Sequence, residues 1–326
     1  MTKARIEDDK IKEMATARII ENSPAKEILE KYAFSFQRKT SSTKLCYIRL
    51  VARYLMDTKH FDIDGFKDIL PVDIEMYLEN SRAAGNKGEK YLSLVYAALT
   101  HFYEFLRKNH KIDANPVTDV DCPRENDDKP VVFMTPDEVT KLKDNIRRRY
   151  GNNSKNHADW YITRDLCLVQ LGVTTGLRVS EIRQIDIDDI DFENLEITVT
   201  QKGNKTRRIC FPLSTMESIE AWMADREEVM DGVEGENALF VSNRRTRWSV
   251  RTIQETIGKY TKDFDKKITP HKMRSTCAST LYEATGDINL AREVLGHTSE
   301  AAIKRYARAS VARRRDSARL LGEMFA

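Results

Sequence analysis

Six side chains in the second half of the sequence belong to types that bind a phosphodiester and react with it. They are two arginines, a lysine, two histidines and a tyrosine: Arg178, Lys202, His271, Arg274, His297 and Tyr306. A guanidinium group can bind two phosphate oxygens at once, and an imidazole can give or take a proton near neutral pH. A tyrosine hydroxyl can serve as a nucleophile. Together these groups could hold a phosphodiester through a pentavalent transition state.

Each of these residues also has a purely structural interpretation. A lysine at a hairpin tip is usually exposed, and a lone tyrosine in a helix is usually packed against its neighbours. His271 and Arg274 weigh more, because they lie three residues apart and share a face near the start of one helix. Two such cationic groups on one face need an anion or an acid nearby. The combination of six, more than any single residue, indicates a phosphate site.

The second half of the chain has a mixed pattern that is mostly helical. Periodicity predicts helices at about 136–149, 159–174 and 179–184, with later helix starts at Ser249, Thr269 and Asp287. Alternating apolar and polar residues predict a strand over 195–200, a turn at 201–205, a returning strand at 207–211 and a short strand near 239–241. Lys202 then lies in the turn of a hairpin. Arg178 follows Gly176, a residue that permits a tight bend.

The first half of the chain predicts helices joined by short loops. They begin at Ser23, about Ser42, Pro71 and Glu89, and the last has an apolar stripe of Tyr91, Leu94, Ala98, Phe102 and Phe105. Residues 115–130 contain three prolines and no apolar periodicity, which is typical of a linker.

These patterns predict four segments and a mainly α fold with a small β-sheet (α+β). Residues 1–22 form a polar leader, either frayed or a short helix, and residues 23–114 form an all-α domain. Residues 115–133 form the linker, and residues 134–326 form the domain that carries the six reactive side chains.

The order and spacing of the motifs resemble the tyrosine recombinases of the Xer and phage-integrase type. The matching strings run from Thr175 to Glu181 and from Lys202 to Lys205, followed by His271-x-x-Arg274, Leu295-Gly296-His297 and Tyr306. The resemblance covers essentially the whole second domain. It extends more loosely to the first, which looks like the family's N-terminal core-binding (SAM-like) domain. Ser275 and Met273 stand where that family usually has histidine and leucine, but outside the catalytic positions.

The resemblance implies a role for each group that makes a bond or moves a proton. Tyr306 attacks the scissile phosphate of duplex DNA and becomes linked to the 3′ phosphate, releasing a 5′ hydroxyl. Lys202 is the general acid for the departing 5′ oxygen, and His271 assists proton transfer from the tyrosine.

The resemblance also implies how charge is held. Arg178 and Arg274 bind the non-bridging oxygens, and His297 donates a hydrogen bond to the phosphate. Rejoining is the reverse transesterification, so we expect no metal and no cofactor. Glu181 lies three residues after Arg178 and either orients it or caps the helix.

The end of the sequence is basic and then apolar. Residues 304–319 contain seven lysines and arginines against one acid, Asp316, which suits phosphate-backbone contact as well as a solvated helix face. Residues 320–325 are largely apolar and pack either on their own domain or on a neighbouring protomer. The second alternative, which the resemblance favours, predicts a homotetramer on DNA through exchange of the C-terminal helix.

Composition limits the other possibilities. The net charge of +3 is a weak argument for nucleic acid, and five cysteines without a C-x-x-C pair argue against zinc spacings and a disulfide framework. No apolar run has the length of a membrane span and no secretory signal is evident, so a cytoplasmic protein is expected. Asp186, Asp188, Asp189 and Asp191 lack the glycine and distal glutamate of a calcium loop.

Two alternatives share parts of this pattern. A type IB topoisomerase would use the same chemistry but would act alone and relax supercoils. A DNA-binding regulator with a decayed site would bind DNA without forming a covalent adduct.

Overall fold

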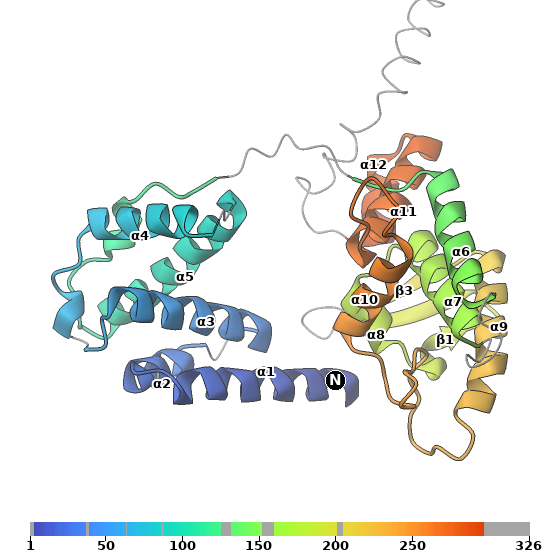
Figure 1. The fold of residues 1–326 in the computed structure, drawn as a ribbon, viewed down its shortest axis with the longest axis horizontal. Helices are drawn as coiled ribbons and strands as arrows, with labels where there is room; N and C mark the ends of the chain where they lie inside the picture. The colour runs from blue at the N-terminus through green and yellow to red at the C-terminus, as the bar shows by residue number, and fades with distance from the viewer. Residues whose placement is uncertain are drawn as a thin grey trace, which may run out of the picture. The chain divides into compact units, whose positions relative to one another are not determined.

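The computed structural model describes residues 3–36, 39–62, 64–85, 88–124, 132–151, 160–200 and 205–296. The chain divides into two compact units, residues 1–128 and 129–326, each with its own core. In the described part of the chain, helices dominate and one small sheet belongs to the second unit, as the sequence predicted (Figure 1).

The first unit is helical throughout its described residues. Its elements are α1 (Lys3–Glu21), α2 (Lys26–Phe34), α3 (Ser41–Thr58), η1 (Asp64–Phe66), α4 (Pro71–Ala83), α5 (Glu89–Lys108) and η2 (Pro116–Asp119). The polar segment at the start is therefore helical, and α1 packs against α3, where Lys44 forms an ion pair with Glu13 at 2.8 Å. Pro71 is the first residue of α4, as expected from its preset φ.

The core of the first unit is rich in aromatic side chains. Tyr54 and Tyr103 are buried and share a hydrogen bond of 2.6 Å between their hydroxyl oxygens. The apolar stripe predicted on α5 is only partly the buried one, because Leu94 is 40% exposed. The buried face instead consists of Leu92, Val95, Ala98, Leu99, Phe102, Tyr103 and Leu106.

The second unit places a three-stranded antiparallel sheet among eight helical segments of the described chain. The helices are α6 (Pro136–Gly151), α7 (Trp160–Thr175), α8 (Val179–Gln184), η3 (Ile187–Asp189), α9 (Leu213–Val229), α10 (Val250–Tyr260), α11 (Pro270–Thr285) and α12 (Ile288–Leu295). The strands are β1 (Ile190–Asp191), β2 (Glu196–Thr200) and β3 (Thr206–Cys210), in the order β1-β2-β3. Ile197 pairs with both Ile190 and Ile209, so the apolar residues of all three strands share the buried face.

The short strand predicted near residues 239–241 is wrong. Ala238 and Val241 form only isolated bridges, with Asp186 and Arg247 respectively. The segment is buried and apolar because it crosses the core. Each of its two ends pairs with a single residue, so no continuous strand pairing forms.

Helix α7 is the centre of the second unit and contacts α6, α9 and α11 (Figure 1). Its second turn contains a buried ion pair in which Arg164 Nη2 lies 2.9 Å from Asp165 Oδ1. Tyr260 donates its hydroxyl to the same carboxylate, and the Arg164 guanidinium lies 4.1 Å from the centre of the Trp248 ring. This network joins α7, α10 and the loop before α10 into one packed body.

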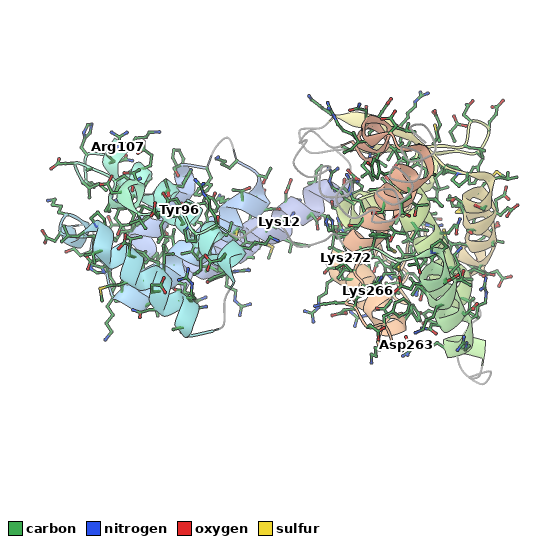
Figure 2. All side chains as sticks on the ribbon, turned by 90° about the horizontal axis from the view of Figure 1, so that it is seen from above. Lys12, Tyr96, Arg107, Asp263, Lys266 and Lys272 are labelled. Carbon is green, nitrogen blue, oxygen red and sulfur yellow. The ribbon has the colours of Figure 1, made fainter. Side chains whose placement is uncertain are left out.

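Helix α11 is fastened to the start of the unit on its N-terminal side. Lys266, in the loop before α11, donates from Nζ to Glu138 Oε2 at 2.7 Å and to the Phe133 carbonyl at 2.6 Å. Thr276 of α11 accepts from the Met134 backbone N–H at 2.9 Å. Lys266 and Lys272 are labelled in Figure 2, where Lys272 marks the first turn of α11. The residues near that turn are thus held in place from outside the helix.

Candidate active site

The turn between α7 and α8 places Arg178 at the start of α8. Gly176 has φ +60°, a left-handed conformation that glycine adopts readily. A Cβ at this position would lie 2.4 Å from Leu295 Cδ2 and 3.1 Å from Cys277 Sγ. The turn therefore needs glycine for its conformation and for the close approach of α11 and α12.

Glu181 both caps α8 and binds the Arg178 side chain. Its Oε2 accepts from the Arg178 backbone N–H at 2.7 Å, and its Oε1 accepts from Arg178 Nη1, also at 2.7 Å. The Glu181 carboxylate is buried, while the Arg178 side chain is 43% exposed. The two interpretations that the sequence left open are both correct: one carboxylate caps the helix and aims a guanidinium that a ligand can still reach.

Arg274 connects three of the sequence motifs. It is 1% exposed, and its Nη1 donates to the Gly176 carbonyl at 2.5 Å while its Nη2 donates to the Leu295 carbonyl at 2.6 Å. One guanidinium thus bridges the turn before Arg178 and the end of α12, and residue 297 follows that end after a single glycine. Helix α12 packs against α11, which completes the junction (Figure 1).

His271 lies in the first turn of α11, directly after Pro270. His271 is exposed to solvent, but nearby protein atoms displace part of the water around its ring and so disfavour the charged form. Burial therefore lowers the pKa of His271, and the positive charges of neighbours that include Arg274 and Arg178 lower it further. The neutral imidazole is favoured, and this form can accept a proton.

Arg207 belongs to the same region, although the sequence analysis did not single it out. It is on β3, and its Nη1 donates to the Val294 carbonyl of α12 at 2.6 Å. Burial lowers the pKa of Arg207; the Glu181 charge opposes this shift and the Arg178 charge adds to it. A signal was available in the sequence. In β3 the side chains of residues 207 and 209 point to one face, and Ile209 is buried, so an arginine stands at a position of the apolar face.

The remaining three predicted residues lie outside the described residues. Lys202 belongs to the connection between Thr200 and Thr206, the paired ends of β2 and β3. His297 follows Gly296, the C-cap of α12, and Tyr306 comes nine residues later. The basic run 304–319 and the apolar run 320–325 are outside the described range too.

The described part of the site is a cluster of cationic side chains from segments that are distant in the sequence. The Arg274 guanidinium joins the turn before Arg178 to the end of α12, where Arg207 binds the preceding carbonyl. His271 lies close enough to Arg274 and Arg178 for their charges to lower its pKa further than burial alone. The phage integrase family matches residues 132–313, which is more than half of the chain. The chain belongs to the phage integrase family.

Comparison with known proteins agrees with this membership. A tyrosine recombinase XerC of Haemophilus influenzae (strain PittEE) is 30% identical over 240 residues, which cover 73% of this chain and 76% of that protein. The chain is accordingly an enzyme, a tyrosine-type site-specific DNA recombinase. Within the described residues, no helix has the length and apolar character needed to cross a membrane.

Solved structures share the fold of this recombinase. A XerH site-specific recombinase bound to a palindromic difH substrate is similar with a TM-score of 0.67 and 20% identity, over 85% of this chain and 78% of that chain. A lambda integrase tetramer bound to a Holliday junction is similar with a TM-score of 0.63 and 19% identity, over 89% of this chain and 80% of that one. At these identities the likeness concerns the fold: helices around a small sheet, with a helical N-terminal unit.

Proposed function

We propose that Tyr306 is the nucleophile of this recombinase and that Arg178 and Arg274 hold the phosphate it attacks. The observation that carries the proposal is the pair of hydrogen bonds from Arg274 to the Gly176 and Leu295 carbonyls. Those two contacts bring the turn before Arg178 and the segment that leads to Tyr306 to a single guanidinium. Residues almost 120 positions apart in the sequence, from Gly176 to Leu295, thus belong to one site.

The proposed reaction exchanges one ester bond at phosphorus for another. The Tyr306 oxygen attacks the phosphorus and its proton passes to the neutral His271 imidazole. The bond to the 5′ oxygen breaks, and Lys202 supplies the proton to that leaving group. The product is a 3′-phosphotyrosine and a free 5′ hydroxyl, and attack by a 5′ hydroxyl reverses the sequence to rejoin a strand.

The positive charge of this cluster supports the assignment. Negative charge grows on the non-bridging oxygens in the transition state, and preorganised guanidinium groups stabilise it most where water is displaced. Arg178 offers an exposed guanidinium and Arg274 a buried one, and His297 is proposed to add a hydrogen bond. A tyrosine hydroxyl has an ordinary pKa near ~10, so the same positive field would favour its loss of a proton.

Covalent trapping tests the nucleophile. The recombination site is first selected from random duplexes by binding to the full chain, and a nicked suicide substrate is then built on it. The wild-type protein should form a covalent protein–DNA adduct, and Tyr306→Phe should bind the site without forming one. Tyr282→Phe, near the far end of α11, is the matched control and should still form the adduct. Adduct accumulation by Tyr306→Phe would falsify the assignment.

We also propose how the chain is organised on DNA. Residues 23–114 form the main part of a DNA-binding domain and residues 134–326 form the catalytic domain. The linker predicted at 115–133 is shorter, because η2 (Pro116–Asp119) belongs to the first unit and Val117 is buried in its core. Four protomers act on two sites through exchange of the C-terminal helix. The similar lambda integrase tetramer on a Holliday junction supports the number of protomers. Removal of residues 310–326 should leave binding to a single site unchanged and abolish synapsis, and intact synapsis would contradict exchange.

We also propose that the protein acts in the cytoplasm. Its five free cysteines fit that reducing compartment.

A further inference from the structure

The C-terminal end of α12 is bound by two arginines from two different elements. The last carbonyls of a helix have no partner within the helix, and they form the negative end of its dipole. The Val294 carbonyl accepts from Arg207 Nη1 at 2.6 Å, and the Leu295 carbonyl, next along the chain, accepts from Arg274 Nη2 at 2.6 Å. The Glu293 carbonyl lies 3.4 Å from Arg207 Nη1. The two guanidinium groups therefore hold adjacent peptide groups of one helix end.

Arg207 is an unfavourable choice if its only task is to stabilise the fold. Its Nε and Nη2 atoms are buried and have no hydrogen-bond partner in the part of the chain that the structure describes. Buried donors are usually satisfied, and leaving one unpaired costs about 1–3 kcal/mol. Burial also disfavours the Arg207 charge and lowers its pKa, and the nearby Arg178 charge adds a smaller repulsion. An apolar side chain would pack here without these costs, so the arginine is better explained by the site than by stability.

We propose that Arg207 is a positioning residue of the recombination site, which holds the end of α12 against β3 so that the Leu295 carbonyl in turn holds the Arg274 guanidinium. This inference rests on the proposed role of Arg274 in binding the phosphate. Arg207 need not touch DNA in this arrangement. It acts through one peptide group, because a shift of the Val294 carbonyl moves the adjacent Leu295 carbonyl with it.

The chain offers a close control for this proposal. Arg208 is the next residue of β3 and carries the same charge, but its side chain is 75% exposed. It forms a long surface ion pair, with 3.5 Å between Arg208 Nη1 and Glu196 Oε2. Arg207→Gln and Arg208→Gln therefore remove the same formal charge from the same strand on opposite faces. Any effect of net charge on DNA binding is common to both variants.

Single-turnover cleavage of the nicked substrate is the main readout. Arg207→Gln should cleave more slowly than Arg208→Gln by a factor of up to about 100, the scale on which small misplacements of catalytic groups act. Both should bind the site with similar affinity. Arg207→Lys, which keeps the charge and one donor, should recover part of the rate. The midpoint of thermal unfolding should change little in Arg207→Gln, because two unsatisfied donors disappear along with one good hydrogen bond.

A double-mutant cycle tests the path of action. If Arg207 works through Arg274, then adding Arg207→Gln to Arg274→Lys should slow cleavage much less than it slows the wild type. Equal slowing in both backgrounds would show that Arg207 acts on its own, for instance on the phosphate itself, and would overturn the proposal. Equal rates for Arg207→Gln and Arg208→Gln would overturn it too. Should Arg207→Gln unfold, the same cycle is measured with Arg207→Lys.

Failure of the underlying assignment has a separate signature. If Arg274→Lys cleaved at the wild-type rate, Arg274 would not bind the phosphate, whatever the effect of Arg207→Gln. Slow cleavage by Arg274→Lys together with a fast Arg207→Gln would remove only the positioning role.

Discussion

Gly176 leaves no room for a side chain, so Gly176→Ala should disturb both the fold and the site. The added methyl group would lie 2.4 Å from Leu295 Cδ2, 3.1 Å from Cys277 Sγ and 3.3 Å from Cys277 Cβ. Leu295 is fully buried, so it has no open space into which to move. The backbone would also have to keep φ near +60° with an alanine side chain.

Two contributions make up the expected loss of stability. A left-handed conformation costs an L-residue about 1–2 kcal/mol, and an extra methyl group in a packed core costs about 1–3 kcal/mol. The free energy of unfolding should therefore fall by about 2–5 kcal/mol. Gly232→Ala isolates the first contribution, because Gly232 has φ +72° and no described atom within 4 Å of the point where a Cβ would lie. Gly258→Ala, inside α10 with open space around it, should instead stabilise by up to about 1 kcal/mol.

Tryptophan fluorescence reads this effect without interference from the first unit. All three tryptophans, Trp160, Trp222 and Trp248, belong to the second unit. A loss of a few kcal/mol in a unit of this size should lower the thermal midpoint by roughly 10 °C. Cleavage should also slow, since the Gly176 and Leu295 carbonyls that hold Arg274 are pushed apart.

Two results would refute the reasoning. In the first, Gly176→Ala is no more destabilising than Gly232→Ala, which would mean that the clash with Leu295 is relieved without cost. The second result concerns Leu295→Ala, which vacates the contested space. Its cost should be about 2–5 kcal/mol alone and clearly smaller in the Gly176→Ala background. Additive losses would show that the two side chains do not compete for that space.

The contacts of Glu181, His271 and Asp165 lead to three further predictions. Glu181→Gln should slow cleavage and lower the free energy of unfolding by about 1–3 kcal/mol, because it weakens both the cap and the ion pair with Arg178. The pKa of His271 is below its ordinary value of 6.5, so the single-turnover rate should stay high at that pH and fall only at lower pH. Asp165→Ala should cost about 3–5 kcal/mol by tryptophan fluorescence, because it leaves Arg164 buried without its carboxylate.

The sign of the pH effect also extends to stability. Between pH 6.5 and the lower pKa of the folded state, the unfolded chain binds a proton at His271 that the folded chain does not. This group therefore destabilises the fold as the pH falls below 6.5, and His271→Asn should reduce that loss. The lowered pKa would be contradicted if, as the pH is lowered, the wild-type cleavage rate had already halved before pH 6.5 was reached and the rate of His271→Asn had not. A wild-type cleavage rate in Glu181→Gln would contradict the first of the three predictions. An unchanged free energy of unfolding in Asp165→Ala would contradict the third.

Local signals in the sequence were sufficient to predict most of the described elements. Proline at the first helical position marked the starts of α4 and α11, and Asp287 and Ser249 cap α12 and α10 with their side chains. Alternation marked β2 and β3 to within a residue. These features depend on residues a few positions apart, which is why a single sequence contains them.

The choice of face and of partner was decided only by tertiary packing. On α5, two overlapping apolar stripes satisfy helical spacing, and the neighbouring helices select the one that leaves Leu94 exposed. The apolar run near Phe240 has strand composition but, among the described residues, meets no strand long enough to pair with.

The sequence by itself determined which side chains could perform phosphoryl transfer, and it placed His271 and Arg274 on one helix. Only the tertiary structure decided that Arg274 binds the Gly176 and Leu295 carbonyls and that Arg207 holds the same helix end. Backbone carbonyls are chemically alike at every position, so the residue types do not indicate which carbonyl will accept a hydrogen bond from a distant guanidinium. That selection is made by the packing of α11, α12 and β3, where the unpaired end of a helix meets buried positive charge.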